Sequence, residues 1–98
     1  MQVIRDFKLA IKDNTLSIRK ADDDAGYSYI IHDSATDLEY SVNYSEYCED
    51  MDIAIFKLDT DRNETDCLIH RHCSDPFGIA FGDVRYSVFM DFYNLIQA

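Results

Sequence analysis

The chain has 98 residues, of which 47% are apolar and 13% aromatic, and it carries a formal net charge of −10. This length fits one small domain, and the aromatic and β-branched content excludes the composition of a disordered chain. The negative charge argues against direct binding to nucleic acid or to an anionic membrane, because both would repel it.

The N-terminal third of the sequence predicts three strands. Apolar residues alternate with polar or small ones over residues 7–11 and again over 15–19, as in half-buried strands. Asp13-Asn14 lies between these runs, and Asn tolerates the left-handed conformation of a tight hairpin turn. Residues 22–26 have the composition of a loop, and residues 27–32 are rich in strand-forming side chains.

The middle of the sequence continues the pattern with three more strands. Residues 38–45 alternate most regularly, after a polar hairpin turn at 33–37. Residues 46–52 are interpreted as an acidic connection. Two further strands are predicted at 53–58 and 67–73, with a polar turn at 59–66 between them. Six strands joined in sequence by short polar turns favour an antiparallel meander.

The hydrophobic period changes near the C-terminus. Asp83 has the side chain of a helix N-cap, and apolar residues then recur every three or four positions up to Ile96. This pattern predicts an amphipathic helix whose apolar stripe covers one face of the sheet. The expected fold class is therefore α+β, with an antiparallel sheet of five to six strands and one C-terminal helix packed on one face.

The sequence carries no signal for export or membrane insertion. The first residues lack the apolar core of a signal peptide, and no run approaches the roughly 18 apolar residues of a membrane span. The three cysteines are odd in number and show no disulfide spacing. We therefore expect a reducing, cytoplasmic location, which would be the host cytoplasm if the chain is phage-encoded.

One cluster contains possible metal ligands, namely Cys67, His70, His72 and Cys73. On a regular strand the two histidines face one side and the two cysteines the other, so one strand cannot surround an ion with all four. A catalytic Cys–His pair would need a base within hydrogen-bond reach, and no local pattern supplies one. The sequence predicts no catalytic, cofactor or metal site, and hence no enzyme.

Asp59-x-Asp61-x-Asn63 opens like a calcium-binding loop. The EF-hand pattern then requires Gly at its sixth position and Glu at its twelfth, where this chain has Glu64 and His70. A hairpin loop is the favoured interpretation, and weak, unspecific cation binding remains an alternative.

Five tyrosines fall on or beside the predicted strands of the middle segment. They could form cross-strand core pairs or an exposed patch for a protein partner, where Tyr is enriched. Core packing is the favoured interpretation. The five are Tyr27, Tyr29, Tyr40, Tyr44 and Tyr47.

Charge is distributed very unevenly along the chain. Residues 1–20 hold five bases and two acids, whereas residues 21–66 hold fourteen carboxylates against only Lys57 and Arg62. An ordinary soluble surface mixes both signs. The resulting charge of −12 in that segment equals the charge on about six base pairs of DNA. The segment could therefore imitate nucleic acid toward a basic protein, or it could serve solubility alone.

These observations favour a non-enzymatic inhibitor that binds a basic, nucleic-acid-binding protein surface. In size and charge alone the chain resembles DNA-mimic proteins such as phage anti-CRISPR proteins, and it carries no sequence motif of such a family. The alternative is an immunity or antitoxin protein that neutralises a basic toxin such as a nuclease. The sequence leaves the oligomeric state open.

The partner-binding residues predicted from the sequence are carboxylates in or near turns. We expect them to reach outward and to contribute little to stability. They are Asp33, Asp37, Glu46, Glu49, Asp50, Asp52, Asp59, Asp61, Glu64 and Asp66.

Overall fold

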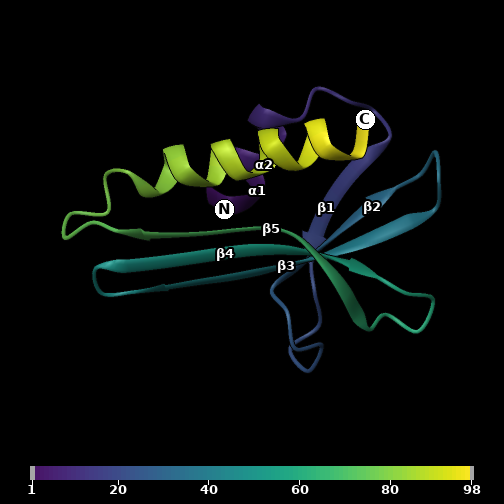
Figure 1. Cartoon of the computed structure of the whole chain (residues 1–98), viewed down its shortest axis with the longest axis horizontal. Helices are drawn as coiled ribbons and strands as arrows, with labels where there is room; N and C mark the ends of the chain where they lie inside the picture. The colour runs from purple at the N-terminus through teal and green to yellow at the C-terminus, as the bar shows by residue number, and fades with distance from the viewer. Residues whose placement is uncertain (1, 98) are drawn as a thin grey trace.

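The computed structural model describes residues 2–97, which form one antiparallel sheet with two helices on one of its faces (Figure 1). The strands lie in chain order, and every neighbouring pair is antiparallel. The predicted α+β class, with a meander sheet and a C-terminal helix packed against it, is confirmed. The elements are α1 (Gln2–Ala10), β1 (Leu16–Lys20), β2 (Tyr29–Asp33), β3 (Leu38–Tyr47), β4 (Asp50–Leu58), β5 (Glu64–Ser74) and α2 (Phe81–Gln97).

The strand predicted over residues 7–11 is wrong, because residues 2–10 form helix α1. Val3, Phe7 and Ala10 are buried at helical spacing, whereas Leu9, which the strand pattern placed beside Phe7, is 55% exposed. A short segment with apolar residues at both spacings fits either period. The apolar stripe of α1 packs against α2, which favours the helix. The sheet consequently has five strands instead of six.

The hairpin predicted at Asp13-Asn14 is wrong, because these residues join α1 to β1. The turns between β3 and β4 and between β4 and β5 are shorter than expected. Residues 46–52, expected as a connection, belong mostly to these two strands, and only Cys48 and Glu49 form the turn. Cys48 takes the left-handed conformation with φ 54°, which a two-residue hairpin turn requires. Similarly, β5 begins at Glu64, so Asp66 lies on a strand and not in the preceding turn.

The main core fills the space between the helices and the sheet. Phe7 meets Phe89 edge-to-face with ring centroids 5.3 Å apart, and Tyr40 meets Phe92 in the same way at 5.0 Å. Edge-to-face pairs add to the stabilisation that burial gives each ring. The strands supply the fully buried residues opposite, which are Ile31, Val42, Met51, Ile53 and Ile55.

The tyrosine prediction is partly confirmed. Tyr29 and Tyr40 are buried in the core, and Tyr44 packs against it while half-buried. Tyr27 is half-buried in the β1–β2 loop, and Tyr47 is 81% exposed beside the β3–β4 turn. The strand positions nearest the sheet centre therefore supply the core, and the exposed ring lies at the end of a hairpin.

A buried ion pair joins the two helices. Arg85 of α2 donates to the carboxylate of Asp6 of α1 at 2.6 Å, and both side chains are almost fully buried. Arg85 also donates to the hydroxyl of Tyr44 at 2.8 Å, which links both helices to β3. Removing one partner of such a pair would leave a buried charge without compensation.

Candidate partner-binding surface

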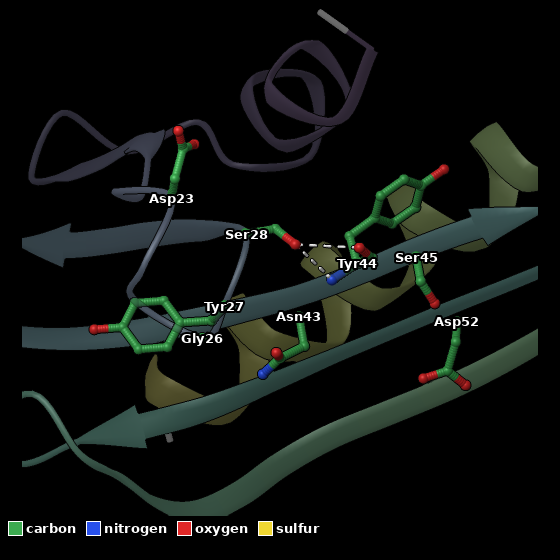
Figure 2. Close-up of a pocket in the computed structure, with 8 residues that line it drawn as sticks. All are labelled: Asp23, Gly26, Tyr27, Ser28, Asn43, Tyr44, Ser45 and Asp52. Carbon is green, nitrogen blue, oxygen red and sulfur yellow. Dashed lines mark hydrogen bonds between the residues drawn. The ribbon is translucent and has the colours of Figure 1, made fainter.

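The helices cover one face of the sheet, and the other face carries mainly polar side chains. We call this second face the open face, and define it by Ser41, Asn43, Asp52, Ala54 and His70, which project from β3, β4 and β5 away from the helices. Figure 2 views part of it with α2 behind the sheet, and shows Asn43 between Tyr27 of the β1–β2 loop and Asp52 of β4.

The open face is shallowly hollowed in two places. One hollow of about 370 Å³ lies between Asp23 and Tyr27 of the β1–β2 loop and Asn43 and Asp52 of the sheet (Figure 2). A second of about 380 Å³ lies between Asn43 and Asp52 on one side and the start of β5 on the other. Both are wide and open. The first is lined mainly by polar groups, whereas Ala54, Phe56 and Cys67 also line the second. Open hollows of this kind fit contact with a large partner better than enclosure of a small ligand.

The ten predicted carboxylates lie mainly at the two ends of the sheet's long axis (Figure 1). We call these ends the Tyr47 end, formed by the β3–β4 turn and the loop from β5 to α2, and the Asp61 end, formed by the β2–β3 and β4–β5 turns. The Tyr47 end holds Glu46, Glu49 and Asp50. Asp33, Asp37, Asp59 and Asp61 lie at the Asp61 end, and Asp52, Glu64 and Asp66 lie along the strands.

The two ends differ in their balance of charge. At the Asp61 end a hollow of about 690 Å³ brings Asp37 and Asp59 together, and Lys57 and Arg62 line it too. Arg62 pairs with Glu39 at 3.1 Å. The Tyr47 end has no such bases, because residues 44–50 and 74–84 hold five carboxylates and no Lys or Arg. The Tyr47 end is therefore the more purely acidic of the two.

No Lys or Arg among residues 2–97 forms a salt bridge with any of the ten carboxylates. The bases that do form salt bridges contact Glu39, Asp91 and Asp6 instead. Eight of the ten are exposed, while Asp33 and Asp52 are half-buried. The negative charge of this surface is thus not neutralised within the described part of the chain by a strong base.

Histidines are the only side chains of a basic residue that contact this group in residues 2–97. His70 lies 2.8 Å from Asp52, His72 lies 3.5 Å from both Asp50 and Asp52, and His32 lies 3.0 Å from Asp37. These contacts help to fix the positions of the three carboxylates.

Seven of the ten carboxylates accept hydrogen bonds inside the chain, which the sequence did not predict. Asp59 accepts the backbone N–H groups of Asp61 and Asn63, both at 2.9 Å, and so orders its own turn. Glu64 accepts from the buried hydroxyl of Ser41 at 2.7 Å and from the amide of Asn43 at 2.6 Å. These side chains therefore also hold groups of the chain itself, in addition to any contact with a partner.

Each of the remaining five hydrogen-bonded carboxylates contacts a backbone N–H, a hydroxyl or an imidazole. Asp33 accepts from the N–H of Ala35, and Glu46 from the hydroxyl of Tyr44 at 2.5 Å. Burial, and next the hydrogen bond to Glu46, raise the pKa of Tyr44 to about 12. Ser74 donates to Asp50, while Asp52 and Asp37 meet histidines.

Three of the predicted residues make no side-chain hydrogen bond or salt bridge to residues 2–97 and are exposed, namely Glu49, Asp61 and Asp66. The ten predicted partner-binding residues do not include a second exposed group, the consecutive aspartates Asp22, Asp23 and Asp24 of the β1–β2 loop. Three adjacent acids with no hydrophobic period are a readable sign of an exposed loop. These six side chains, together with the exposed Asp83 of α2, are the carboxylates most available to a partner.

The cysteine–histidine cluster is arranged differently from the expectation. A bulge in β5 aligns Cys67 with Phe56 and Ile69 with Ile55, so Cys67 lies on the open face near His70. Cys73 packs against the core. Within residues 2–97 no three His, Cys, Asp or Glu side chains are grouped to hold a metal ion. The hydrogen bonds of the described histidines go to carboxylates and Ser74, not to cysteine.

Comparison of the chain with protein-family models, with curated proteins and with solved structures found no match. None of the helices in the described residues is long and apolar enough to cross a membrane.

Proposed function

We propose that this chain is a non-enzymatic inhibitor that binds a basic, nucleic-acid-binding protein through its carboxylates. The observation that carries the proposal is that the ten carboxylates have no Lys or Arg partner in residues 2–97, while eight of them are exposed. Like charges held together on a folded surface repel each other, and a basic partner would relieve that repulsion.

The dimensions of the molecule support imitation of nucleic acid. Its longest axis is 39 Å, close to one turn of duplex DNA at about 34–36 Å. The acidic Tyr47 end and the Asp61 end lie at opposite ends of that axis (Figure 1), and the open face with its half-buried Asp52 lies between them. A groove that accepts a phosphate backbone presents basic side chains along a similar length, and the carboxylates could contact it at several points.

The first experiment identifies a partner and asks whether nucleic acid competes for it. Immobilised protein captures its partner from the native host, and the purified partner is then titrated with and without DNA or RNA. Under the proposal the chain displaces nucleic acid, and its affinity falls steeply as salt rises, since screening shortens the reach of exposed charges to about 8 Å at physiological ionic strength. Tight binding that leaves nucleic acid bound would instead favour the immunity-protein alternative.

A charge-matched pair of variants tests the carboxylates themselves. The triple variant Glu49→Gln, Asp61→Asn, Asp66→Asn neutralises the three free carboxylates. Because it removes three exposed charges, it should weaken partner binding about tenfold. The control variant has the same net charge, from Gln2→Lys, Asn94→Lys and Gln97→Lys at exposed helix positions. If both variants bind equally well, the acidic surface serves solubility and the proposal fails.

A further inference from the structure

Two large apolar side chains are almost fully exposed on the loop between β5 and α2. Phe77 is 83% exposed and Ile79 is 79% exposed. The β3–β4 hairpin lies at the same end of the molecule (Figure 1), and Tyr47 beside its turn is 81% exposed. Three such side chains at one end of a small domain form an unusual concentration, because exposed apolar residues are ordinarily scattered singly over a surface.

The loop that carries Phe77 and Ile79 is fixed by hydrogen bonds. The carboxylate of Asp75 accepts the N–H of Phe77 at 3.0 Å and the N–H of Ala80 at 2.8 Å. These bonds lower the pKa of Asp75, with that from Ala80 contributing most. Gly78, with φ 67°, supplies the left-handed turn between the two apolar residues. The side chains are therefore held outward by an ordered backbone, which reduces the entropy lost when a partner binds them.

The loop is also tied to the acidic hairpin. The N–H of Asp75 donates to the carbonyl oxygen of Glu49 at 2.7 Å, and Ser74 pairs with Asp50 across the sheet. The exposed apolar residues thus share one end with the free carboxylate of Glu49 and with Glu46 and Asp50. Residues 44–50 and 74–84 contain no Lys or Arg.

This surrounding charge decides what kind of surface can cover the apolar residues. A second copy of the chain would bring another net charge of −10 against the same end, and an anionic membrane would be repelled in the same way. A protein with an apolar pocket rimmed by basic side chains is complementary in both respects. Aromatic and aliphatic anchors in a pocket, surrounded by a charged rim, are the usual anatomy of a protein interface.

We propose that Phe77 and Ile79, flanked by Tyr47, form an apolar anchor that inserts into a pocket on the basic partner protein. This inference rests on the proposed function and adds a location to it, because it places the centre of the interface at the Tyr47 end. The carboxylates would then steer the two proteins together, and the anchor would determine how slowly they separate.

The anchor is tested first by site-specific photocrosslinking in the native host. A photoreactive phenylalanine analogue replaces Phe77 in one variant and Leu9 in a control, since Leu9 is 55% exposed on α1. Under the proposal the analogue at position 77 crosslinks a basic protein, and the analogue at position 9 does not. Equal yields at both positions, no crosslink at position 77, or a crosslink to a second copy of the chain would each overturn the inference.

The crosslinked protein is then purified and titrated with unlabelled variants. Phe77→Ser and Ile79→Ser should each weaken binding at least tenfold through faster dissociation, with the salt dependence unchanged. The control Leu95→Ser, at a 49% exposed position on α2, should bind like the original chain. Circular dichroism should find the fold intact in all three, because the side chains replaced are exposed.

The two proposals fail in different ways in this experiment. Full binding by the serine variants, with loss on neutralising the three free carboxylates, would overturn the anchor and leave the proposed function standing. Loss of binding by the serine variants, with full binding after neutralisation, would keep the anchor and overturn the electrostatic function.

Discussion

The two faces of the sheet are built from the same strands, but one is buried against the helices and the other faces solvent. On the helix-covered face, alternate residues such as Val42, Ile53 and Ile55 are fully buried against the helices. On the open face, their neighbours Asn43 and Asp52 line shallow, open hollows. The comparison indicates that the main hydrophobic core lies on one face, so substitutions on the other face should affect stability less.

The largest expected effect is on the covered face. Phe92 is fully buried and meets Tyr40 edge-to-face at 5.0 Å. Phe92→Ala should lower the free energy of unfolding by roughly 3–5 kcal/mol, because it removes a buried ring and leaves a cavity. Urea denaturation followed by circular dichroism measures this. An unchanged transition midpoint would contradict the packing described for α2.

A somewhat smaller loss of stability is expected from breaking the buried ion pair between the two helices. Asp6→Ala should cost about 3 kcal/mol, because it leaves the Arg85 guanidinium buried without its carboxylate. The double variant Asp6→Ala, Arg85→Met should recover much of that loss, since it removes both charges together. Thermal unfolding of the single and double variants gives the comparison. A double variant less stable than Asp6→Ala would show that the ion pair does not account for the loss.

Substitutions on the open face and at its edge should lower stability less than those in the core. Among them, loss of the Glu64 side chain should have a larger effect than loss of Asp66. Glu64→Ala should lower stability by about 1–2 kcal/mol, because it leaves the buried Ser41 hydroxyl without its acceptor. Asp66→Ala, two residues along the same strand and without a side-chain partner in residues 2–97, should stay within about 0.5 kcal/mol of the original. Denaturant titrations of the pair would sharpen the contrast, and equal effects would contradict it.

Much of the fold could be predicted because its main signals are local. The alternation over residues 38–45 and the helical spacing from Val84 to Ile96 each place one face against a core, and the structure has β3 and α2 there. The first helix could not be predicted in the same way. Residues 7–11 fit both periods, and the choice between them depends on α2, which lies more than seventy residues further along the chain.

The candidate surface was predictable as a charge pattern and not as a set of free side chains. Composition identified an acidic segment with almost no bases, and the structure finds no strong base paired with the ten carboxylates in residues 2–97. Whether a carboxylate is free depends on the donors that the fold brings to it. Glu64 meets Ser41 across 23 positions of sequence, for example, and the β5 bulge that turns Cys67 to the open face has no sequence signal that we recognise.

The ion pair between Asp6 and Arg85 joins positions 79 residues apart, and this separation bears on how the chain is assembled. During synthesis the segment that forms α1 emerges before all five strands, yet its main packing partner, α2, emerges after them. A helix of nine residues is too short to persist alone in water. The amide protons of α1 should therefore become protected from exchange only when α2 docks, so that a segment made before the strands is among the last to fold.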